Sequence, residues 1–400
     1  MTEARELTPE EREARIAELR ARRRARMRKL AIRSALGTLV LVLLAAFAVY
    51  WLLWTLGGRD FLMAQIVARL PAGTRLTWEK AEGPVAGSLA LNGLRFEMKS
   101  CPDKDGQPVP YGQCAKPGTL VFTAKRVVID PDIRPLLGKL LRLDALDIQG
   151  ATLELPKSDE PFELPRWPEV LPNIDLPLAM QADTIRIDGF KVSQAGESLI
   201  EIRSARGGVD ARQGRLHIEQ LVVDSDRGHF SVHGDYAPRD DYRMSLTASA
   251  LLPAPPARTR PRIGLAARGD LSKLDIAISG NVPDKLRALL TLRGKDDPRW
   301  HFTASTTALD PGLIIGSGEP GTPLAFDLKA DGIGGEANLQ GKLRQGDLDV
   351  VLQPSKVKLE QQVLEFKPLA VDVFGGHIVA RGRGDFSKPE DANFKFSVNA

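Results

Sequence analysis

Residues 222–236 read VVDSDRGHFSVHGDY, and residues 370–386 read AVDVFGGHIVARGRGDF. In both stretches a Gly-His pair comes four residues after an Asp, and a second Gly comes six residues after the first. Apolar and polar residues alternate after the first Gly, as Phe230 and Val232 do in the first copy. Period-two alternation predicts a strand with one apolar face, and the first Gly predicts a tight turn before it. A hairpin written twice indicates a repeat architecture, in which each unit covers its apolar face with its neighbours.

The alternation continues over most of the chain from about residue 76. It slips across Gly150 and between Ile218 and Leu221, where we expect turns or β-bulges. Helical patterns are rare in this part, so we predict a mainly β fold, an elongated, repeat-built, twisted sheet that forms a trough with an apolar interior. The candidate residues for this apolar surface are Ile185, Ile187, Leu216, Ile218, Phe230, Val232, Leu274, Ile276, Ile278, Phe326, Leu328 and Ile378.

The composition agrees with a folded β protein. Of the 400 residues, 43% are hydrophobic, which is enough for a sizeable apolar interior and excludes a disordered chain. The 36 Gly and 28 Pro, with only 6% aromatic residues, favour many short strands and turns. The net charge of +4 is concentrated before residue 35, where eleven Arg or Lys stand against six Glu. The rest of the chain is almost neutral, which argues against a nucleic-acid partner.

No motif in the sequence supports catalysis, a metal or a cofactor. Residues 316–321, GSGEPG, satisfy the GxGxxG pattern, but Pro320 interrupts the helix that a nucleotide site needs, and we expect a loop. The sequence contains neither a P-loop nor an HExxH pair. His229 and His233 could share a strand face as metal ligands, but the second copy has Arg381 in place of His233. We therefore expect structural histidines and a protein that is not an enzyme.

Residues 35–56, ALGTLVLVLLAAFAVYWLLWTL, are 22 residues without a charge. A helix of that length spans the roughly 30 Å hydrocarbon core of a bilayer, so we predict a transmembrane signal-anchor helix. The basic residues 1–34 precede it, and the positive-inside rule then places this tail in the cytoplasm and the rest of the chain in an exported compartment. A cleavable signal peptide is the alternative, because Ala46-Phe47-Ala48 resembles a cleavage site. The apolar run continues to Leu56 and argues against cleavage.

Two features lie between the anchor and the sheet. Residues 57–75 show helical spacing before a Pro-Ala-Gly stop and predict a membrane-proximal helix, which could lie on the outer leaflet or cap the first strands. Cys101 and Cys114 are the only cysteines and bracket a polar loop of Pro and Gly. In an exported segment this isolated pair predicts a local disulfide, whereas the spacing does not fit a metal site. Residues 76–400 would form the β-repeat region.

Several phrases of the first half resemble the TamB branch of the AsmA-like proteins, which belong to the bridge-like lipid-transfer superfamily. After the basic tail and the anchor come LTWEKAEGPVAGSLALNGLRFE, FTAKRVVIDPDIRPLLGKLLRLDALDIQGATLELP and LPNIDLPLAMQADTIRIDGFKVS. The resemblance covers about residues 30 to 195, and the later repeats match only as a pattern. It identifies the chain as similar to the N-terminal portion of TamB, the inner-membrane subunit of a translocation and assembly module. The chain ends within a predicted strand at KFSVNA, and members of the family are longer, so a fragment is one interpretation.

The resemblance implies an inner-membrane-anchored bridge in the periplasm of a Gram-negative envelope. Such a bridge would carry phospholipid between the inner and outer membranes through a hydrophobic β-groove, without a cofactor, and support outer-membrane biogenesis. It also implies an outer-membrane assembly partner of the Omp85 type. The alternative is a non-conducting scaffold that pairs with that partner in protein insertion or secretion. Strand alternation suits both, because it builds an open groove and a packed sandwich core equally well.

Overall fold

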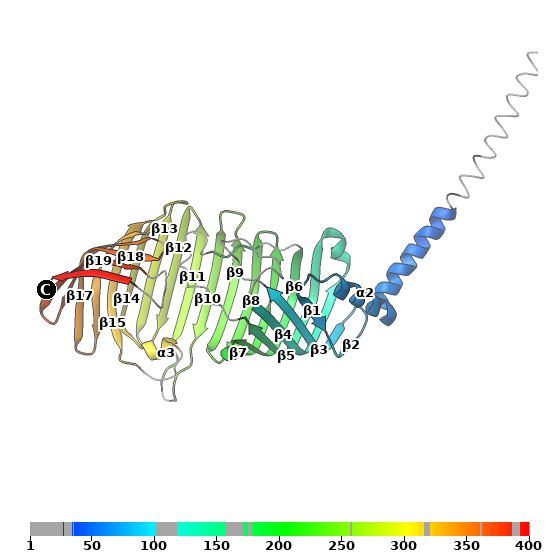
Figure 1. Cartoon of the computed structure of the whole chain (residues 1–400), viewed down its shortest axis with the longest axis horizontal. Helices are drawn as coiled ribbons and strands as arrows, with labels where there is room; N and C mark the ends of the chain where they lie inside the picture. Colours follow the sequence, from blue (N-terminus) through cyan, green and yellow to red (C-terminus); the bar gives the residue numbers. More distant parts are fainter. Residues whose placement is uncertain are drawn as a thin grey trace, which may run out of the picture. The chain divides into compact units, whose positions relative to one another are not determined.

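The computed structural model describes residues 27, 34, 36–100, 118–156, 171–174, 178–256, 258–315, 321–360, 362–385 and 393–399. The chain divides into two compact units, residues 1–68 and 69–400. The first unit is helical and the second is built almost entirely of strands (Figure 1). The predicted mainly β fold with one N-terminal apolar helix is confirmed.

The first unit contains two helices in succession. One helix, Leu36–Trp54, has a mean hydropathy of 2.5 and is long and apolar enough to cross a membrane. The second, α2, runs from Leu56 to Ala68. It ends earlier than the helix expected over residues 57–75, because Gly73 adopts a positive φ of 86° and β1 begins at Thr74.

The second unit is one open, twisted sheet of twenty strands. The strands are β1 (Thr74–Thr77), β2 (Lys80–Glu82), β3 (Leu89–Ser100), β4 (Gly118–Asp132), β5 (Leu140–Leu155), β6 (Ala179–Gln194), β7 (Glu197–Arg212), β8 (Arg215–Ser225), β9 (Gly228–Ala237), β10 (Arg243–Leu251), β11 (Arg262–Asp270), β12 (Lys273–Asn281), β13 (Lys285–Arg293), β14 (Arg299–Leu309), β15 (Leu324–Ile333), β16 (Glu336–Gln345), β17 (Leu348–Glu360), β18 (Val363–Val373), β19 (Gly376–Asp385) and β20 (Asn393–Asn399). A 3-10 helix η1 (Arg134–Gly138) precedes β5, and a short helix α3 (Pro311–Ile315) follows β14.

The order of strands in the sheet follows the order in the chain from β3 to β20 (Figure 1). The short strands β1 and β2 both pair with β3. All of these pairings are antiparallel except that of β5 with β6, which is parallel. A parallel pair needs a crossover connection, and residues 156–178 provide it. From β6 to β10, from β11 to β14 and from β15 to β19, short connections join each strand to the next, as expected for a hairpin repeat.

Of the two predicted slips in alternation, the one in β8 is a β-bulge, and the one at Gly150 is a kink that leaves the pairing register unchanged. Gly150 adopts a φ of 59°, and Ile148 and Ala151 on either side of it still face the same side, opposite Val127 and Ala124. A second irregularity falls between Ile218 and Leu221 of β8. The extra residue in β8 and the positive φ of Gly150 in β5 restore the phase, so that apolar side chains stay on one face over a long strand.

The repeated phrase forms the two hairpins that its pattern predicts. The first turn joins β8 to β9 at Asp226 and Arg227, and the second joins β18 to β19 at Phe374 and Gly375. Gly234, the second Gly of the first copy, has a φ of 132°, and a Cβ placed there would lie 2.0 Å from the carbonyl oxygen of Ser245. Only glycine fits this close approach of two strands, which explains why this position of the phrase is Gly.

Candidate functional site

The pairing registers bring the predicted apolar residues to one face of the sheet. Ile218 lies opposite Gly234, which lies opposite Leu246 on the next strand. This row continues across the sheet through Ala267, Ile276, Leu290, Phe302, Ala330 and Leu339. Since partners in adjacent strands share a face, the row is a continuous apolar line from β8 to β16. We call this side of the sheet the apolar face.

All twelve candidate residues lie on the apolar face. The registers link Ile187 to Ala205, Ala205 to Val223 and Val223 to Phe230, so that the candidates of β6 and β9 share one side. Ile378 of β19 is joined in the same way through Val371, Leu352 and Gly341 to Leu328 of β15. The remaining candidates follow from the same registers: Ile185, Leu216, Ile218, Val232, Leu274, Ile276, Ile278 and Phe326.

Most of these twelve side chains keep part of their surface accessible to solvent. Eleven of the twelve are half-buried, and the exception is Leu274, which is 1% exposed. Leu274 belongs to a cluster with Tyr236, Met244, Ala267 and Leu292 near one end of the strands. In a closed two-layer core most inward-facing side chains would be fully buried. The apolar face therefore keeps apolar surface accessible along much of the sheet.

One segment outside the sheet packs on the apolar face. Leu171 and Ile174, from the connection between β5 and β6, contact the cluster around Leu274. The phenol of Tyr236 donates a hydrogen bond to the carbonyl oxygen of Pro172 at 2.6 Å, and the backbone N–H of Gly214 donates one to Ile174 at 3.3 Å. The full burial of Leu274 thus coincides with the place where the chain covers its own apolar face. The sequence marks the segment only as a proline-rich loop, and reasoning from strand periodicity missed this contact.

The opposite face is polar and solvated. Its charged side chains pair across strands, as in Arg293 with Asp275 at 2.7 Å and His217 with Asp235 at 2.8 Å. Both pairs are largely exposed, so each contributes little to stability. Alternation thus separates a polar side from an apolar side, as the sequence predicted.

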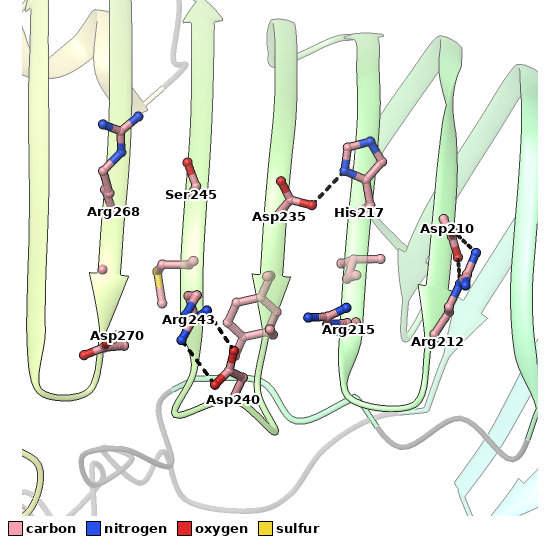
Figure 2. A pocket seen from close by; sticks show the side chains of 15 residues that line it. Asp210, Arg212, Arg215, His217, Asp235, Asp240, Arg243, Ser245, Arg268 and Asp270 are labelled. Carbon is pink, nitrogen blue, oxygen red and sulfur yellow. Dashed lines mark hydrogen bonds and ion pairs between the residues drawn. The ribbon is translucent and has the colours of Figure 1, made fainter.

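The polar face has a hollow of about 810 Å³ over β7 to β11 (Figure 2). Carboxylates and guanidiniums line it in equal numbers, with Asp210, Asp235, Asp240 and Asp270 beside Arg212, Arg215, Arg243 and Arg268. Hydrogen bonds from the Ser272 hydroxyl and from the backbone N–H groups of Ser272 and Lys273 lower the pKa of Asp270. A carboxylate held ionised in this way is unsuited to proton transfer near neutral pH. Within the hollow, Arg212 pairs with Asp210 at 2.9 Å and Arg243 with Asp240 at 3.2 Å.

The other residues singled out in the sequence do not gather at one place. His377 contacts Asp372 at 2.5 Å within its hairpin, and the hydrogen bond from His377 is the main cause that lowers the pKa of Asp372. Among the described residues, no cluster of His, Cys, Asp and Glu could hold a metal ion. Cys101 and Cys114, and residues 316–320 of the GSGEPG segment, lie outside the described residues. The disulfide therefore stays a prediction.

In the described part of the chain, one helix that is long and apolar enough to cross a membrane precedes an open sheet with one accessible apolar face, an arrangement that suits a bridge-like protein. The family described as TamB, N-terminal domain, matches residues 136–398. The chain therefore belongs to the TamB family. The match reaches residue 398, within β20, and so includes the repeats that had resembled this family only as a pattern. Comparisons with curated proteins and with solved structures each gave no match.

Proposed function

We propose that the apolar face is a track for phospholipid, and that the chain is a membrane-anchored bridge which carries lipid between the inner and outer membranes in support of outer-membrane biogenesis. The observation that carries this proposal is the placement of twelve apolar residues on one face from β6 to β19, eleven of them only half-buried. Membership of a family of bridge-like proteins supports the same function.

The free energy of moving a lipid through water explains why such a face is needed. Each CH₂ group transferred from an apolar surface into water costs about 0.8 kcal/mol, so a free acyl chain does not cross an aqueous compartment readily. A continuous apolar face keeps the tail covered at every step, and an uncovered side leaves the headgroup in water. No residue of this mechanism needs to form or break a covalent bond, which agrees with a protein that is not an enzyme.

Photocrosslinking from paired positions tests the lipid track. Ile218 and His217 are neighbours on opposite faces of β8, and Val232 and His233 are neighbours on opposite faces of β9. A photoreactive residue at Ile218 or Val232, in the full chain in its native membrane, is expected to crosslink to phospholipid. The same residue at His217 or His233 is the matched control and is expected to give none. Equal yields on both faces, or none at Ile218 and Val232, would reject the track.

If the protein were a non-conducting scaffold, the side chains of the apolar face would have to be packed in a closed core that excludes water. The half-buried state of Ile218 and Phe230 disfavours it, because side chains in a packed core lose nearly all contact with water. An outer-membrane partner of the Omp85 type is compatible with either function. Crosslinks from the apolar face to protein alone, without lipid, would favour the scaffold.

We also propose that the helix Leu36–Trp54 anchors the chain in the inner membrane, with its N-terminus in the cytoplasm and the sheet in the periplasm. The helix is long enough and apolar enough to span, and the basic residues lie before it. A reporter enzyme that folds only in an exported compartment should be active when it is fused after Gly73. A reporter that is active only in the cytoplasm should be inactive at the same position. Cytoplasmic activity at this fusion point, or a mature chain that begins near Val49, would reverse the assignment.

A further inference from the structure

The helix α2 has an apolar side that stays exposed among the described residues of the first unit, apart from a ring contact of Phe61 with Trp51. At 3.6 residues per turn, Leu56, Phe61 and Val67 fall within an arc of about 140°. Their exposed fractions are 58%, 50% and 37%. Met63 lies about 20° from Leu56, at the edge of this arc, and is 6% exposed. The half-buried Leu62 lies opposite the centre of the arc. Ile66, in the last turn, is 51% exposed as well. A helix side of this kind is usually buried against an apolar partner.

The junction between the two helices fixes the direction in which α2 leaves the anchor. The hydroxyl of Thr55 donates to the carbonyl oxygen of Trp51 at 2.6 Å and accepts from the backbone N–H of Gly58 at 3.0 Å. A Cβ at Gly58 would lie 2.1 Å from the carbonyl oxygen of Trp51. In a continuous helix, residues seven apart are too far apart for such a contact, so the chain turns sharply at Thr55. The rings of Trp51 and Phe61, 6.4 Å apart, contact each other across this corner.

The corner coincides with the expected edge of the bilayer. The 19 residues of the first helix span about 28 Å, close to the thickness of the hydrocarbon core. Tyr50 and Trp54 stack at its end with ring centroids 5.8 Å apart, and such aromatic residues favour the headgroup layer. Because α2 begins two residues after Trp54, its first turn starts in the same layer.

We propose that α2 is an interfacial helix, which lies along the outer leaflet of the anchoring membrane with Leu56, Phe61 and Val67 inserted among the acyl chains. A lipid surface is the partner that this position favours for the exposed side of α2. The turn at Thr55 keeps the start of α2 in the headgroup layer, where the membrane-spanning helix ends. Asp60, the charged residue on the exposed arc, pairs with Arg59 at 2.7 Å and can stay at headgroup depth. The inference rests on the proposed membrane anchor and deepens it, because it adds a second membrane contact beside the span.

Four single positions in the full chain test the inference, each carrying a photoreactive residue in turn. The protein is placed in vesicles of phosphatidylethanolamine and phosphatidylglycerol. Leu43 reports the span, Phe61 and Val67 report the exposed side of α2, and Leu62 is the control on its other side. Lipid crosslinks are expected at Leu43, Phe61 and Val67, and far fewer are expected at Leu62. A fluorophore at Val67 should be quenched more by nitroxides near the headgroup than by nitroxides deep in the acyl chain.

The outcomes separate this inference from the anchor on which it rests. Lipid adducts at Leu43 without adducts at Phe61 and Val67 would overturn the interfacial helix and leave the anchor standing. The absence of lipid adducts at all four positions would overturn both. Adducts from Phe61 and Val67 to a second copy of the chain or to another protein would show that a protein covers this side. Stronger quenching at Val67 by deep nitroxides would show that α2 enters the bilayer core.

Discussion

The phenol of Tyr236 lies 2.6 Å from the carbonyl oxygen of Pro172, although the two residues are 64 positions apart in the chain. This hydrogen bond fastens the connection between β5 and β6 to the apolar face, beside the cluster that buries Leu274. The chain thus covers part of the surface along which we propose that lipid moves. Replacing Tyr236 with Phe removes only the phenol oxygen, and therefore tests what this hydrogen bond contributes.

Tyr236→Phe should loosen this connection while keeping the packing of the ring. The loss of one hydrogen bond is expected to lower the free energy of unfolding by about 1 kcal/mol. Amide hydrogen exchange should speed up in residues 171–174 and at Gly214, whose N–H donates to Ile174. Tyr242→Phe is the matched control, since its ring lies 6.3 Å from that of Tyr236. Unchanged exchange in the Tyr236 variant would mean that Leu171 and Ile174 hold the connection by packing alone.

Stability should fall at alkaline pH because of the same phenol. Burial, with a smaller contribution from Tyr242, raises the pKa of Tyr236 from 10.0 to about 12. Since the folded pKa lies above the unfolded one, this contribution is fully present below pH 10.0 and is lost as the pH rises towards about 12. The difference in unfolding free energy between wild type and Tyr236→Phe, measured by denaturant titration, should shrink over that range. A difference that stays constant would show that the phenol is as accessible as in the unfolded chain.

The sequence predicts the apolar face well, because the face depends on local alternation. Ile276 and Ile278 are two residues apart in one strand, and a period of two places them on the same side without knowledge of any partner. The position of the bulge between Ile218 and Leu221 could be predicted for the same reason. The parallel pairing of β5 with β6 could not, because it depends on the path of a long connection. The contact of Tyr236 with Pro172 is equally non-local, so the periodicity of the sequence cannot predict it.

Gly234→Ala should destabilise the sheet more than Gly196→Ala. Both glycines have a positive φ, 132° at Gly234 and 85° at Gly196, so each substitution costs about 1 kcal/mol in backbone strain. A Cβ at Gly234 would also meet the carbonyl oxygen of Ser245 at 2.0 Å, while a Cβ at Gly196 has nothing within 4 Å. We expect a total loss of about 3 kcal/mol or more at Gly234, measured by thermal or denaturant unfolding. Equal losses at the two sites would mean that β9 and β10 can move apart at this point.

The neighbours Ile276 and Ala277 offer the sharpest test of an open apolar face. Ile276 lies on the apolar face opposite Ala267 and Leu290, and the exposed Ala277 lies on the polar face opposite Ala266 and Leu289. Ala277→Asp should change the free energy of unfolding by no more than about 0.5 kcal/mol, as a typical surface substitution does. Ile276→Asp should cost about 1–3 kcal/mol, because a half-buried carboxylate can still turn towards water.

Of the same two variants, only Ile276→Asp should reduce lipid binding. An acyl chain that passes a carboxylate at position 276 would have to displace its water, which is costly, so the amount of phospholipid that copurifies with the full chain should fall sharply. Ala277→Asp adds the same charge on the polar face and should leave the bound lipid unchanged. If instead Ile276→Asp costs more than about 4 kcal/mol, Ile276 belongs to a sealed core. Unfolding of that size without any loss of bound lipid would decide against the track and in favour of a scaffold.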